Sequence, residues 1–333
     1  MKRIKIAQIG TSQYSHGTVI WKSLLKQRDI FEVAGYCFPE KEREKYPREM
    51  AAFEGCPELT LEQILEDPTI QAVTVETEEK YLVKYALLAA RHGKHIHMEK
   101  PGGRELRDFE TLIDTVKKMG TVLHLGYMYR YNPAVQSAIE KAKSGALGRI
   151  CCVEAQMSCP EPPDLRQWLA EYPGGMMFFL GCHLIDLVLR IMGKPDAILP
   201  MNASLGFAGA QGEDYGFAVL KYKGIASFVK TCGWELGGFE RRQLVICGTE
   251  GSLELKPLEW YFPEGLKTRT RESRGSGWTE AGALDWSEGV DRYDGMTASF
   301  AAMVRGEKEN PYTPDYELEL YRTILMCCGG EAL

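Results

Sequence analysis

The stretch His95-Ile96-His97-Met98-Glu99-Lys100-Pro101 decides how the first half of the chain is interpreted. Its first four residues are a short run that predicts a buried strand. Glu99, Lys100 and Pro101 follow directly, so they would stand at the carboxyl end of that strand, where open α/β sheets bind their ligands. Proline fixes the backbone φ angle of the position after the lysine. Because an isolated tripeptide of this kind is more often a surface loop, the surrounding sequence has to give it meaning.

The segments around this stretch alternate between strand and helix patterns. Strands are predicted over residues 4–9, 31–37, 72–77, 95–98 and 122–126. Helices are predicted over residues 18–27, 40–53, 106–119 and 133–145, with a further one through residues 85–90 that stops at Gly93. Thr60 and Gln63 frame a capping box at the start of another helix. Short strand–helix connections are typical of βαβ units, so we predict an α/β domain with a doubly wound parallel sheet.

The pattern changes after about residue 150. Strands are predicted over residues 150–158, 198–205, 215–222, 225–232, 242–247 and 252–255, and Lys223-Gly224 is typical of a hairpin turn. Helices are predicted over residues 175–192, 295–305 and 316–328, and residues 263–289 are predicted to be a long loop. This half therefore predicts an α+β domain with a large open, mainly antiparallel sheet.

Size and charge exclude several classes of protein. At 333 residues the chain is long enough for two domains. The net charge of −6, without a long run of Lys or Arg, argues against nucleic acid as a partner. The start of the chain is too interrupted for a signal peptide. Residues 176–192 include His183, Asp186 and Arg190, which favours a buried amphipathic helix over a membrane span, so no membrane partner is expected.

The ten cysteines are scattered and none forms a Cys-x-x-Cys pair. This distribution favours reduced, mostly buried thiols in a cytoplasmic protein over a disulfide framework. No metal site is predicted.

Residues 10–15, Gly10-Thr11-Ser12-Gln13-Tyr14-Ser15, stand where a dinucleotide-binding fingerprint would stand. The first glycine is present, whereas serines replace the second and third. A helix N-terminus with small residues can still bind a phosphate. The acid that usually ends the second strand and binds ribose hydroxyls is replaced by Phe38. Lys41 and Arg43 are compatible either with a 2′-phosphate or with the solvated face of a helix.

Two later segments carry candidate chemistry. Residues 127–133 follow a strand end and supply three tyrosines, Arg130 and Asn132, which suit a hydroxylated ligand or a helix entry capped by Asn132. Residues 174–186 open on two glycines and place His183 a little over two turns into an apolar helix. A histidine there is usually a core residue, but an imidazole facing a cleft could take a proton from an alcohol.

Together these motifs resemble the glucose–fructose oxidoreductase, inositol dehydrogenase and MocA (Gfo/Idh/MocA) family. The resemblance covers nearly the whole chain in order and rests on residues 93–95, 99–101, 129–133, 145–149, 174–175, 183–186 and 248–253. It implies a Rossmann domain over residues 1–126 that binds NAD or NADP. It also implies a substrate-binding and oligomerisation domain over residues 127–333, whose sheet makes homodimer or homotetramer contacts. The terminal helix is a candidate to pack back on the first domain.

The resemblance also implies an activity and roles for individual residues. The family mostly transfers hydride between the nicotinamide and a hydroxyl carbon of a sugar, cyclitol or related small molecule. Lys100 and His183 would be catalytic. The implied cofactor-binding residues are Gly10, Thr11, Ser12, Gln13, Tyr14, Phe38, Thr77, Glu99, Lys100 and Pro101. The implied substrate-binding residues are Tyr129, Arg130, Trp168 and His183.

Three departures from the family pattern keep other functions open. Phe179 stands where the family usually has an aspartate four residues before the histidine. The family's Thr-Pro after the strand over residues 72–77 is Thr77-Glu78 here, and the glycine fingerprint is incomplete. These departures suit a family member that binds a dinucleotide or sugar without turning it over. A redox-neutral glycoside-cleaving enzyme that holds NAD tightly is the third possibility.

Overall fold

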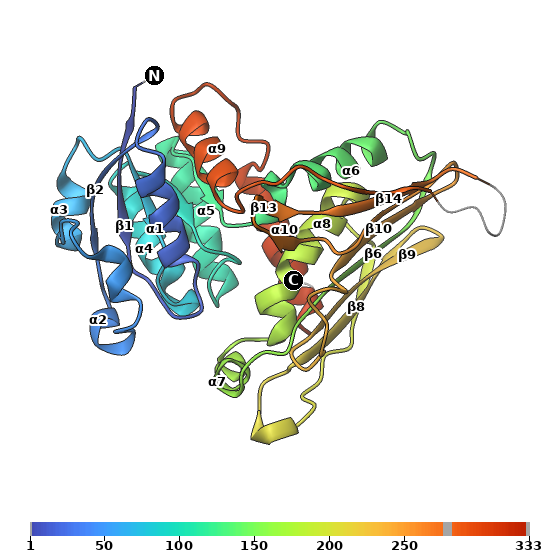
Figure 1. Cartoon of the computed structure of the whole chain (residues 1–333). Helices are drawn as coiled ribbons and strands as arrows, with labels where there is room; N and C mark the ends of the chain where they lie inside the picture. The colour runs from blue at the N-terminus through green and yellow to red at the C-terminus, as the bar shows by residue number, and fades with distance from the viewer. Residues whose placement is uncertain (1, 276–281, 331–333) are drawn as a thin grey trace. The chain divides into compact units, whose positions relative to one another are not determined.

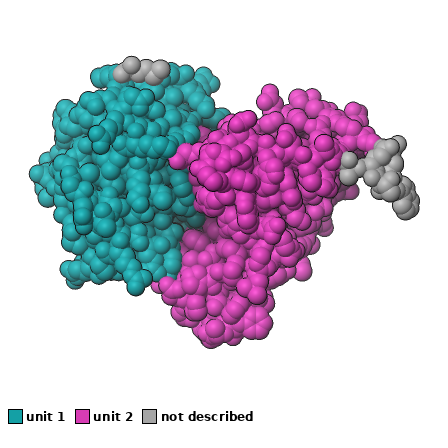
Figure 2. Space-filling model, in the orientation of Figure 1, with its two compact units in different colours: residues 1–128, 293–321 teal, residues 129–292, 322–333 magenta. Residues whose placement is uncertain are grey.

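The computed structural model describes residues 2–275 and 282–330, which fold as two compact units. The first unit takes the described residues through Met128 together with Tyr293–Tyr321. The second takes those of Tyr129–Arg292 and from Arg322 onward (Figure 2). The sequence predicted a boundary after residue 126, with the terminal helix as a candidate to pack back on the first domain. The structure has the chain re-enter the first unit at residue 293 and leave it again within the last helix.

The first unit is built on a five-stranded parallel sheet in the order β2-β1-β3-β4-β5 (Figure 1). Its strands are β1 (Ile4–Ile9), β2 (Phe31–Cys37), β3 (Ala72–Val75), β4 (His95–Met98) and β5 (Leu123–Leu125). The sheet is wound in both directions from β1, so the predicted doubly wound fold is confirmed. Strand order reverses between β1 and β3, where open α/β sheets form their ligand crevice.

The helices of this unit are α1 (Gly17–Lys26), α2 (Glu42–Lys45), α3 (Leu61–Glu66), α4 (Leu82–Arg91), α5 (Leu106–Met119) and α9 (Asp294–Val304). Local signals mark the ends of two of them, α3 and α5. The capping box predicted at Thr60 and Gln63 is present at α3. The α5 helix ends at Gly120, whose φ of 65° is a left-handed conformation that glycine adopts without strain.

The prediction of one helix over residues 40–53 is wrong. The structure has only the single turn α2, then turns, then a 3-10 helix at Met50–Phe53. Pro47 disfavours the helical conformation of Tyr46, which explains the break. Glu40 and Lys41, directly before α2, both have positive φ angles, 59° and 60°.

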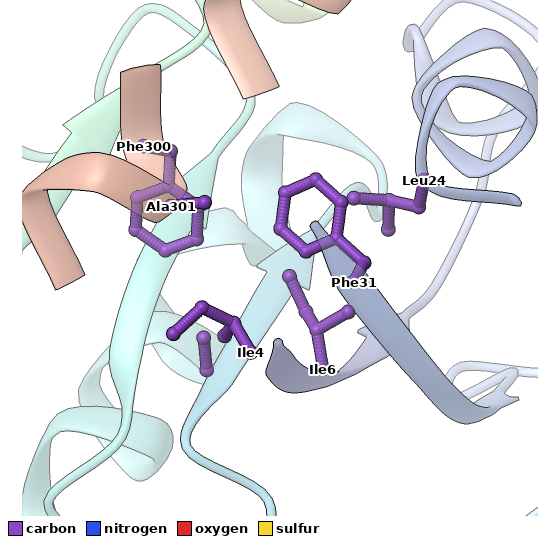
Figure 3. Packing of buried hydrophobic residues seen from close by; sticks show 7 residues of the cluster. Ile4, Ile6, Leu24, Phe31, Phe300 and Ala301 are labelled. Carbon is purple, nitrogen blue, oxygen red and sulfur yellow. The ribbon is translucent and has the colours of Figure 1, made fainter. Parts of the chain in front are cut away.

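Helix α9 belongs to the hydrophobic core of the first unit. Phe300 and Ala301 of α9 pack with a cluster that the first three strands and α1 provide, namely Ile4, Ile6, Leu24, Phe31 and Ala72 (Figure 3). Each of these seven side chains is at most 2% exposed. Full burial of a large aliphatic or aromatic side chain stabilises by about 1.5–3 kcal/mol, so α9 is an integral part of this unit.

The second unit is built on an eight-stranded sheet in the order β15-β14-β11-β10-β6-β9-β8-β7. Its strands are β6 (Ile150–Ser158), β7 (Ala197–Pro200), β8 (Tyr215–Tyr222), β9 (Ile225–Cys232), β10 (Gln243–Gly248), β11 (Ser252–Leu255), β14 (Arg269–Ser273) and β15 (Leu284–Trp286). Only the β6–β9 pair is parallel, so the predicted mainly antiparallel sheet is confirmed. Two further strands, β12 (Trp260–Phe262) and β13 (Gly265–Lys267), form a separate hairpin.

Helices of the second unit are α6 (Pro133–Lys143), α7 (Pro163–Trp168) and α8 (Cys182–Met192), and the last helix is α10 (Pro314–Cys327). Figure 1 shows α8 on one face of the large sheet, beside β6. The helix predicted over residues 175–192 is present, and its first part, Met177–Gly181, is a π-helical turn that leads directly into α8. Such wider turns inside helices are frequent at functional sites.

The prediction of a loop over residues 263–289 is wrong for much of its length. It holds β13, β14 and β15, while residues 276–281 lie outside the described part of the chain. All five residues of β14 are only half-buried and those of β15 are exposed. Strand β15 is the edge of the sheet and β14 lies next to it, and neither strand has a fully buried position, so no alternation of buried and polar residues could reveal them.

Within the described ranges, no helix combines the length and the apolar character that crossing a lipid bilayer requires. All ten cysteines are free thiols.

Candidate functional site

Lys100 lies at the carboxyl end of β4, between the ends of β3 and β5. The Glu99 amide donates to the Val75 carbonyl at 3.0 Å, and the Gly126 amide donates to the Met98 carbonyl at 2.9 Å. The sheet hydrogen bonds therefore continue up to the residue before the lysine. Lys100 is 1% exposed, so its side chain is buried. The peptide bond to Pro101 is cis.

The carboxylate of Glu99 is anchored by donors from two directions. It accepts the His16 imidazole Nδ1 at 2.6 Å and the His16 amide at 3.1 Å, and also the amide of Lys100 at 2.9 Å. Its Oε1 lies 3.7 Å from Lys100 Nζ. Burial opposes ionisation, but the charges of His16 and Lys100 outweigh it and hold the pKa of Glu99 well below its usual range. Glu99 is therefore an anion that fixes the start of α1 next to the lysine.

Two more buried carboxyl groups follow β3. Glu76 and Glu79 are 0% and 1% exposed, and no hydrogen-bond donor among the described residues reaches their oxygens. Burial raises the pKa of Glu79 to about 8, against the opposing charge of Lys100, and burial together with Glu99 raises the pKa of Glu76. Glu79 therefore holds a proton near neutral pH. Buried polar groups without partners often mark the place where a ligand supplies them.

Side chains of the loop between β1 and α1 form hydrogen bonds with the backbone amides of the same loop. Gly10 has φ 82°, and a Cβ there would lie 2.3 Å from Thr77 Cγ2, so only glycine fits beside Thr77. Ser12 Oγ accepts the Ser15 amide at 3.0 Å, and Ser15 Oγ accepts the amides of Ser12 at 3.0 Å and Gly17 at 3.2 Å. The serines that replace the glycines thus satisfy loop amides, which hydroxyl rotation can free for a phosphate.

Glu42 reaches this loop from α2. It is completely buried, and its Oε2 accepts the Thr11 amide at 3.2 Å. Both of its carboxyl oxygens lie 3.0 Å from the position of a Cβ on Gly10. Phe38, by contrast, packs into an aromatic cluster with Tyr36 and Phe53, at ring distances of 4.8 and 4.9 Å. The structure thus brings Glu42, and not Phe38, to the backbone of Gly10 and Thr11.

In the second unit Tyr129 and His183 lie together. Their rings are 5.7 Å apart at 79°, an edge-to-face arrangement. The Tyr129 hydroxyl donates to Glu259 Oε1 at 2.8 Å, and burial beside Glu259 raises the pKa of the tyrosine. The same Glu259 oxygen accepts Arg242 at 2.6 Å and Arg292 at 2.8 Å. His183 is 2% exposed at the start of α8.

Arg130 forms a buried ion pair within this unit. It is 1% exposed and donates from Nε and Nη2 to the two carboxyl oxygens of Asp186, at 3.0 and 2.8 Å. A two-pronged pair of this kind fixes both side chains. Asp186 follows His183 by slightly less than one turn of α8. The ion pair between Arg130 and Asp186 therefore orients the first turn of this helix. Asn132 caps α6, with its side-chain oxygen accepting the amides of Ala134 and Val135 at 2.9 and 3.2 Å, as the sequence suggested.

Phe179, where the family usually has an aspartate, packs against Trp168. The two rings lie 5.6 Å apart at 84°, and Trp168 also lies 4.6 Å from the ring of Tyr172. Phe179 sits in the π-helical turn, so its phase relative to His183 differs from that of a regular helix. An apolar contact between aromatic rings therefore stands at the position where the family usually has a carboxylate.

The sequence predicted Lys100, Glu99, Thr77, Tyr129 and His183 as site residues, and it did not single out the buried acids Glu42, Glu76 and Glu79. Lys100 belongs to the first unit and His183 to the second. Gln13 is exposed and Tyr14 half-buried in the loop, and Pro101 is buried beside the lysine. The sequence did contain a signal for Glu76 and Glu79, since residues 76–79 hold three glutamates at the end of a buried strand. Glu42 had no local signal.

Comparison with known proteins identifies the family. Residues 4–127 match the model of an oxidoreductase family with an NAD-binding Rossmann fold, and residues 135–254 match the GFO/IDH/MocA C-terminal domain. A 1,5-anhydro-D-fructose reductase of Ensifer adhaerens is 27% identical over 63% of this chain and 64% of its own length. A scyllo-inositol 2-dehydrogenase (NAD⁺) of Bacillus subtilis is 32% identical over 59% of this chain and 58% of its own length.

The chain thus spans about three fifths of the length of these curated relatives. Solved structures match over nearly the full length. A levoglucosan dehydrogenase, solved with NADH and levoglucosan, has a TM-score of 0.78 at 18% identity and 98% coverage of both chains. The 3-ketoreductase KijD10 of Actinomadura kijaniata, solved with NADP and TDP-benzene, has a TM-score of 0.79 at 18% identity, covering 96% of this chain and 95% of its own. With an NAD-binding Rossmann domain and the matching C-terminal domain, the chain belongs to the Gfo/Idh/MocA family of oxidoreductases.

Proposed function

We propose that the protein is an NAD(P)-dependent oxidoreductase that transfers hydride between the nicotinamide and a hydroxyl-bearing carbon of a sugar, cyclitol or related small molecule. The observation that carries this proposal is the buried ammonium group of Lys100 at the carboxyl end of β4, set among Glu76, Glu79 and Glu99. Burial of an ammonium group carries a desolvation cost that the Glu99 carboxylate only partly offsets, and buried titratable groups of this kind cluster at functional sites. The relatives named above act on an anhydro sugar and an inositol.

The residues of the first unit suit a dinucleotide. Gly10 keeps the backbone open beside Thr77, the serine hydroxyls hold loop amides that a phosphate can take over, and Glu42 and Glu79 offer buried oxygens to hydroxyl donors. When bound, the nicotinamide supplies the hydride acceptor or donor.

Two residues carry the polar part of the chemistry in this proposal. The Lys100 ammonium holds the substrate oxygen and stabilises the alkoxide that develops there, an effect often equal to about 3–4 kcal/mol for one well-placed donor in a dry site. The imidazole of His183 takes the hydroxyl proton on a ring nitrogen, because its ordinary pKa lies near neutrality. Tyr129 stacks edge-on against that ring and limits its orientation.

The decisive experiment separates binding from turnover. Fluorescence titration with NADH and NADPH tests the cofactor, and a panel of sugars and cyclitols read at the nicotinamide absorbance band tests turnover. We expect binding of at least one reduced nucleotide and turnover of at least one polyol or keto sugar. If the protein binds neither NADH nor NADPH, the proposal is wrong. Release of an aglycone without net absorbance change would favour redox-neutral glycoside cleavage.

One observation favours a second candidate, a family member that binds a dinucleotide or sugar without turnover. Phe179 fills the usual carboxylate position and packs on Trp168, so no acid at that position holds a substrate hydroxyl. In the same panel, this function predicts tight nucleotide binding, sugar-dependent changes in fluorescence, and no change in the nicotinamide absorbance.

We also propose that the protein is a cytoplasmic homodimer or homotetramer formed through the large sheet. The ten free thiols suit a reducing compartment. Phe217 and Phe228 stack at 5.5 Å on half-buried positions of β8 and β9, which alternate with the buried face of those strands. Sedimentation of the purified protein, compared with a Phe228→Glu variant, tests the assembly, and loss of the oligomer in the variant is expected.

A further inference from the structure

We propose that Glu76 is a redox-linked proton carrier of the candidate site. Its carboxyl group is neutral in the free protein and beside a reduced nicotinamide. It becomes a carboxylate beside the oxidised nicotinamide, whose ring carries a positive charge, and its proton passes to solvent. The inference rests on the proposed dinucleotide binding and adds how the site distinguishes the two oxidation states of the cofactor.

Glu76 lies at the crevice where the strand order of the first sheet reverses. Its amide donates to the Ile9 carbonyl at 2.9 Å, so Glu76 directly continues β3 beside the end of β1. Its Cβ lies 3.2 Å from the position of a Cβ on Gly17, the first residue of α1. The side chain therefore starts next to the loop between β1 and α1, at the same edge of the sheet as Lys100. Open α/β sheets bind their ligands at this edge.

The carboxyl group of Glu76 is poorly stabilised as an anion. It is 0% exposed, and neither oxygen has a hydrogen-bond donor among the described residues. Burial raises the pKa of Glu76 well above its ordinary value, the Glu99 carboxylate adds to this effect, and the Lys100 ammonium group opposes it. A further positive charge brought to this point by a ligand therefore favours release of the proton.

The fixed charges of the site leave an oxidised nicotinamide without an anionic partner. Lys100 Nζ lies 3.7 Å from Glu99 Oε1, and Glu99 also accepts the imidazole of His16 at 2.6 Å. The ionised acid beside the lysine is thus already engaged. A second cation next to a buried ammonium group is costly, and ionisation of Glu76 offsets that cost. A neutral, reduced nicotinamide adds no positive charge, so Glu76 keeps its proton.

Two buried histidines adjoin Glu76. His97 Nε2 lies 3.6 Å from Glu76 Oε1, and His97 Nδ1 lies 2.7 Å from Nδ1 of His124. The two histidines are 1% and 2% exposed. Burial lowers the pKa of His97 to about 4, so this imidazole is neutral near pH 7. One proton forms the hydrogen bond between the two Nδ1 atoms, and either ring can donate it.

The position of that proton can follow the charge of Glu76. With a neutral Glu76, His97 accepts at Nε2 and donates from Nδ1 to His124. With an ionised Glu76, His97 carries its proton at Nε2, facing the carboxylate, and accepts at Nδ1 from His124. Both rings stay neutral in either arrangement, so only the proton of Glu76 leaves the three groups. The change of tautomer supplies the donor that the carboxylate needs.

Glu79 is the main competitor for this role. It too is buried without a hydrogen-bond donor among the described residues, and burial raises its pKa to about 8. Glu76 is favoured because His97 Nε2 faces it at 3.6 Å. The titratable and charged groups that face Glu76 or act on His97 come from the neighbouring strand ends, the residue before α1 and the turn after β3: Glu99, Lys100, His124, His16 and Glu79.

The test measures binding of the oxidised and the reduced nucleotide to the full chain by calorimetry, in two buffers that differ in ionisation enthalpy. The nucleotide pair is that of NAD or NADP, whichever binds more tightly, and the pH runs from about 6 to about 9. We expect the oxidised form to release up to about one proton more than the reduced form. Its affinity relative to the reduced form should therefore rise with pH, by up to about tenfold per pH unit.

Glu76→Gln keeps the volume of the side chain and removes the titratable group. In this variant the extra proton release and the pH dependence of the affinity ratio should disappear. The oxidised form should bind at least about tenfold more weakly than to the wild type at the upper end of the pH range. The matched control is Glu79→Gln, a neighbouring buried acid, which should retain the extra proton release.

A spectroscopic readout tests the tautomer change directly. In protein with labelled histidines, the ring-nitrogen resonances of His97 should change from the Nδ1–H to the Nε2–H pattern when the oxidised nucleotide replaces the reduced one. A purely structural role of Glu76 would leave this pattern unchanged.

Equal proton release by the two nucleotide forms in the wild type would overturn this inference and leave the proposed oxidoreductase function standing. That measurement decides the matter even if Glu76→Gln does not fold. Loss of the extra release in Glu79→Gln, with its retention in Glu76→Gln, would overturn the assignment to Glu76. Binding of neither nucleotide pair would overturn both proposals.

Discussion

Glu99 joins the end of β4 to the start of α1 by accepting both the imidazole and the backbone amide of His16, at 2.6 and 3.1 Å. These two residues are 83 positions apart in the sequence. The same carboxylate lies 3.7 Å from Lys100 Nζ, so one buried anion fixes a helix start and the neighbouring ammonium group. This arrangement couples the stability of the first unit to the charge state of its candidate site.

The first prediction concerns the charge of Glu99. Glu99→Gln should lower the free energy of unfolding by about 3 kcal/mol near neutral pH, because the buried Lys100 ammonium group loses its anionic partner. The pKa of Glu99 is lowered in the folded state, so its contribution is complete above the ordinary value of 4.5 and is lost as pH falls below that value. Urea unfolding at several pH values checks this. The exposed Glu105→Gln is the control, and an equal loss in both variants would contradict the argument.

The second prediction concerns Lys100 itself. Lys100→Met should reduce turnover by about 10²–10³-fold, because the developing alkoxide loses its positive partner. Affinity for the reduced nucleotide should stay within a few-fold of the wild type, as measured by fluorescence titration. Lys118→Met, on the exposed face of α5, serves as the control. Unchanged turnover in Lys100→Met would remove the lysine from the mechanism.

The third prediction contrasts two adjacent acids of opposite behaviour. Burial raises the pKa of Glu79 to about 8, so the folded state binds a proton that the unfolded state releases between the ordinary value of 4.5 and about 8. Stability therefore falls as pH rises through that window. Glu79→Gln should raise the free energy of unfolding by about 2–3 kcal/mol at neutral pH, and the gain should vanish near pH 4.

Glu78 provides the matched comparison for Glu79. Although burial opposes it, hydrogen bonds from Lys80 and Lys45 lower the pKa of Glu78, so its contribution is present above the ordinary value of 4.5 and declines below it. Because both lysines are partly exposed, Glu78→Gln should cost only about 1 kcal/mol. Thermal unfolding of the two variants across pH measures the difference. Shifts of the same sign would show that the environments of these acids are misassigned.

The fourth prediction asks whether Arg130 serves the fold or the substrate. Arg130→Met should lower the free energy of unfolding by about 3–5 kcal/mol, because Asp186 is left as a buried, uncompensated charge. Adding Asp186→Leu should recover part of that loss, which a double-mutant cycle from urea unfolding measures. Should Arg130→Met unfold like the wild type while raising KM, Arg130 would be a substrate contact, as the family resemblance implied.

The regular elements of both units were predictable because their signals are local. Strand β4 and helix α5 have the predicted bounds, since each combines an apolar periodicity with a local stop signal. The segment over residues 40–53 failed because its helix-forming residues masked the effect of Pro47. Strands β14 and β15 were not predicted because none of their residues is fully buried, so their sequences show no alternating pattern.

The candidate site was predictable only where a motif stands at a strand end. Lys100 and Glu99 follow β4 directly, so the sheet topology alone places them at the ligand edge. Glu42 was not predictable, because its burial depends on positive φ angles at Glu40 and Lys41 that nothing in the residue types announces. Arg130 was predicted as a ligand contact, but its pairing with Asp186 depends on how α8 packs in the second unit.

The amino-acid sequence alone determined the strands of the first sheet and their parallel character, most of the helices of both units, and the lysine at the sheet edge. Those features follow from side-chain periodicity, capping residues and turn residues within short windows. Only the tertiary structure decided that Phe300 packs with Ile4, that Glu42 faces Thr11, and that His16 holds Glu99. Such contacts join residues far apart in the chain, and they form only when the complete backbone path brings their side chains within bonding distance.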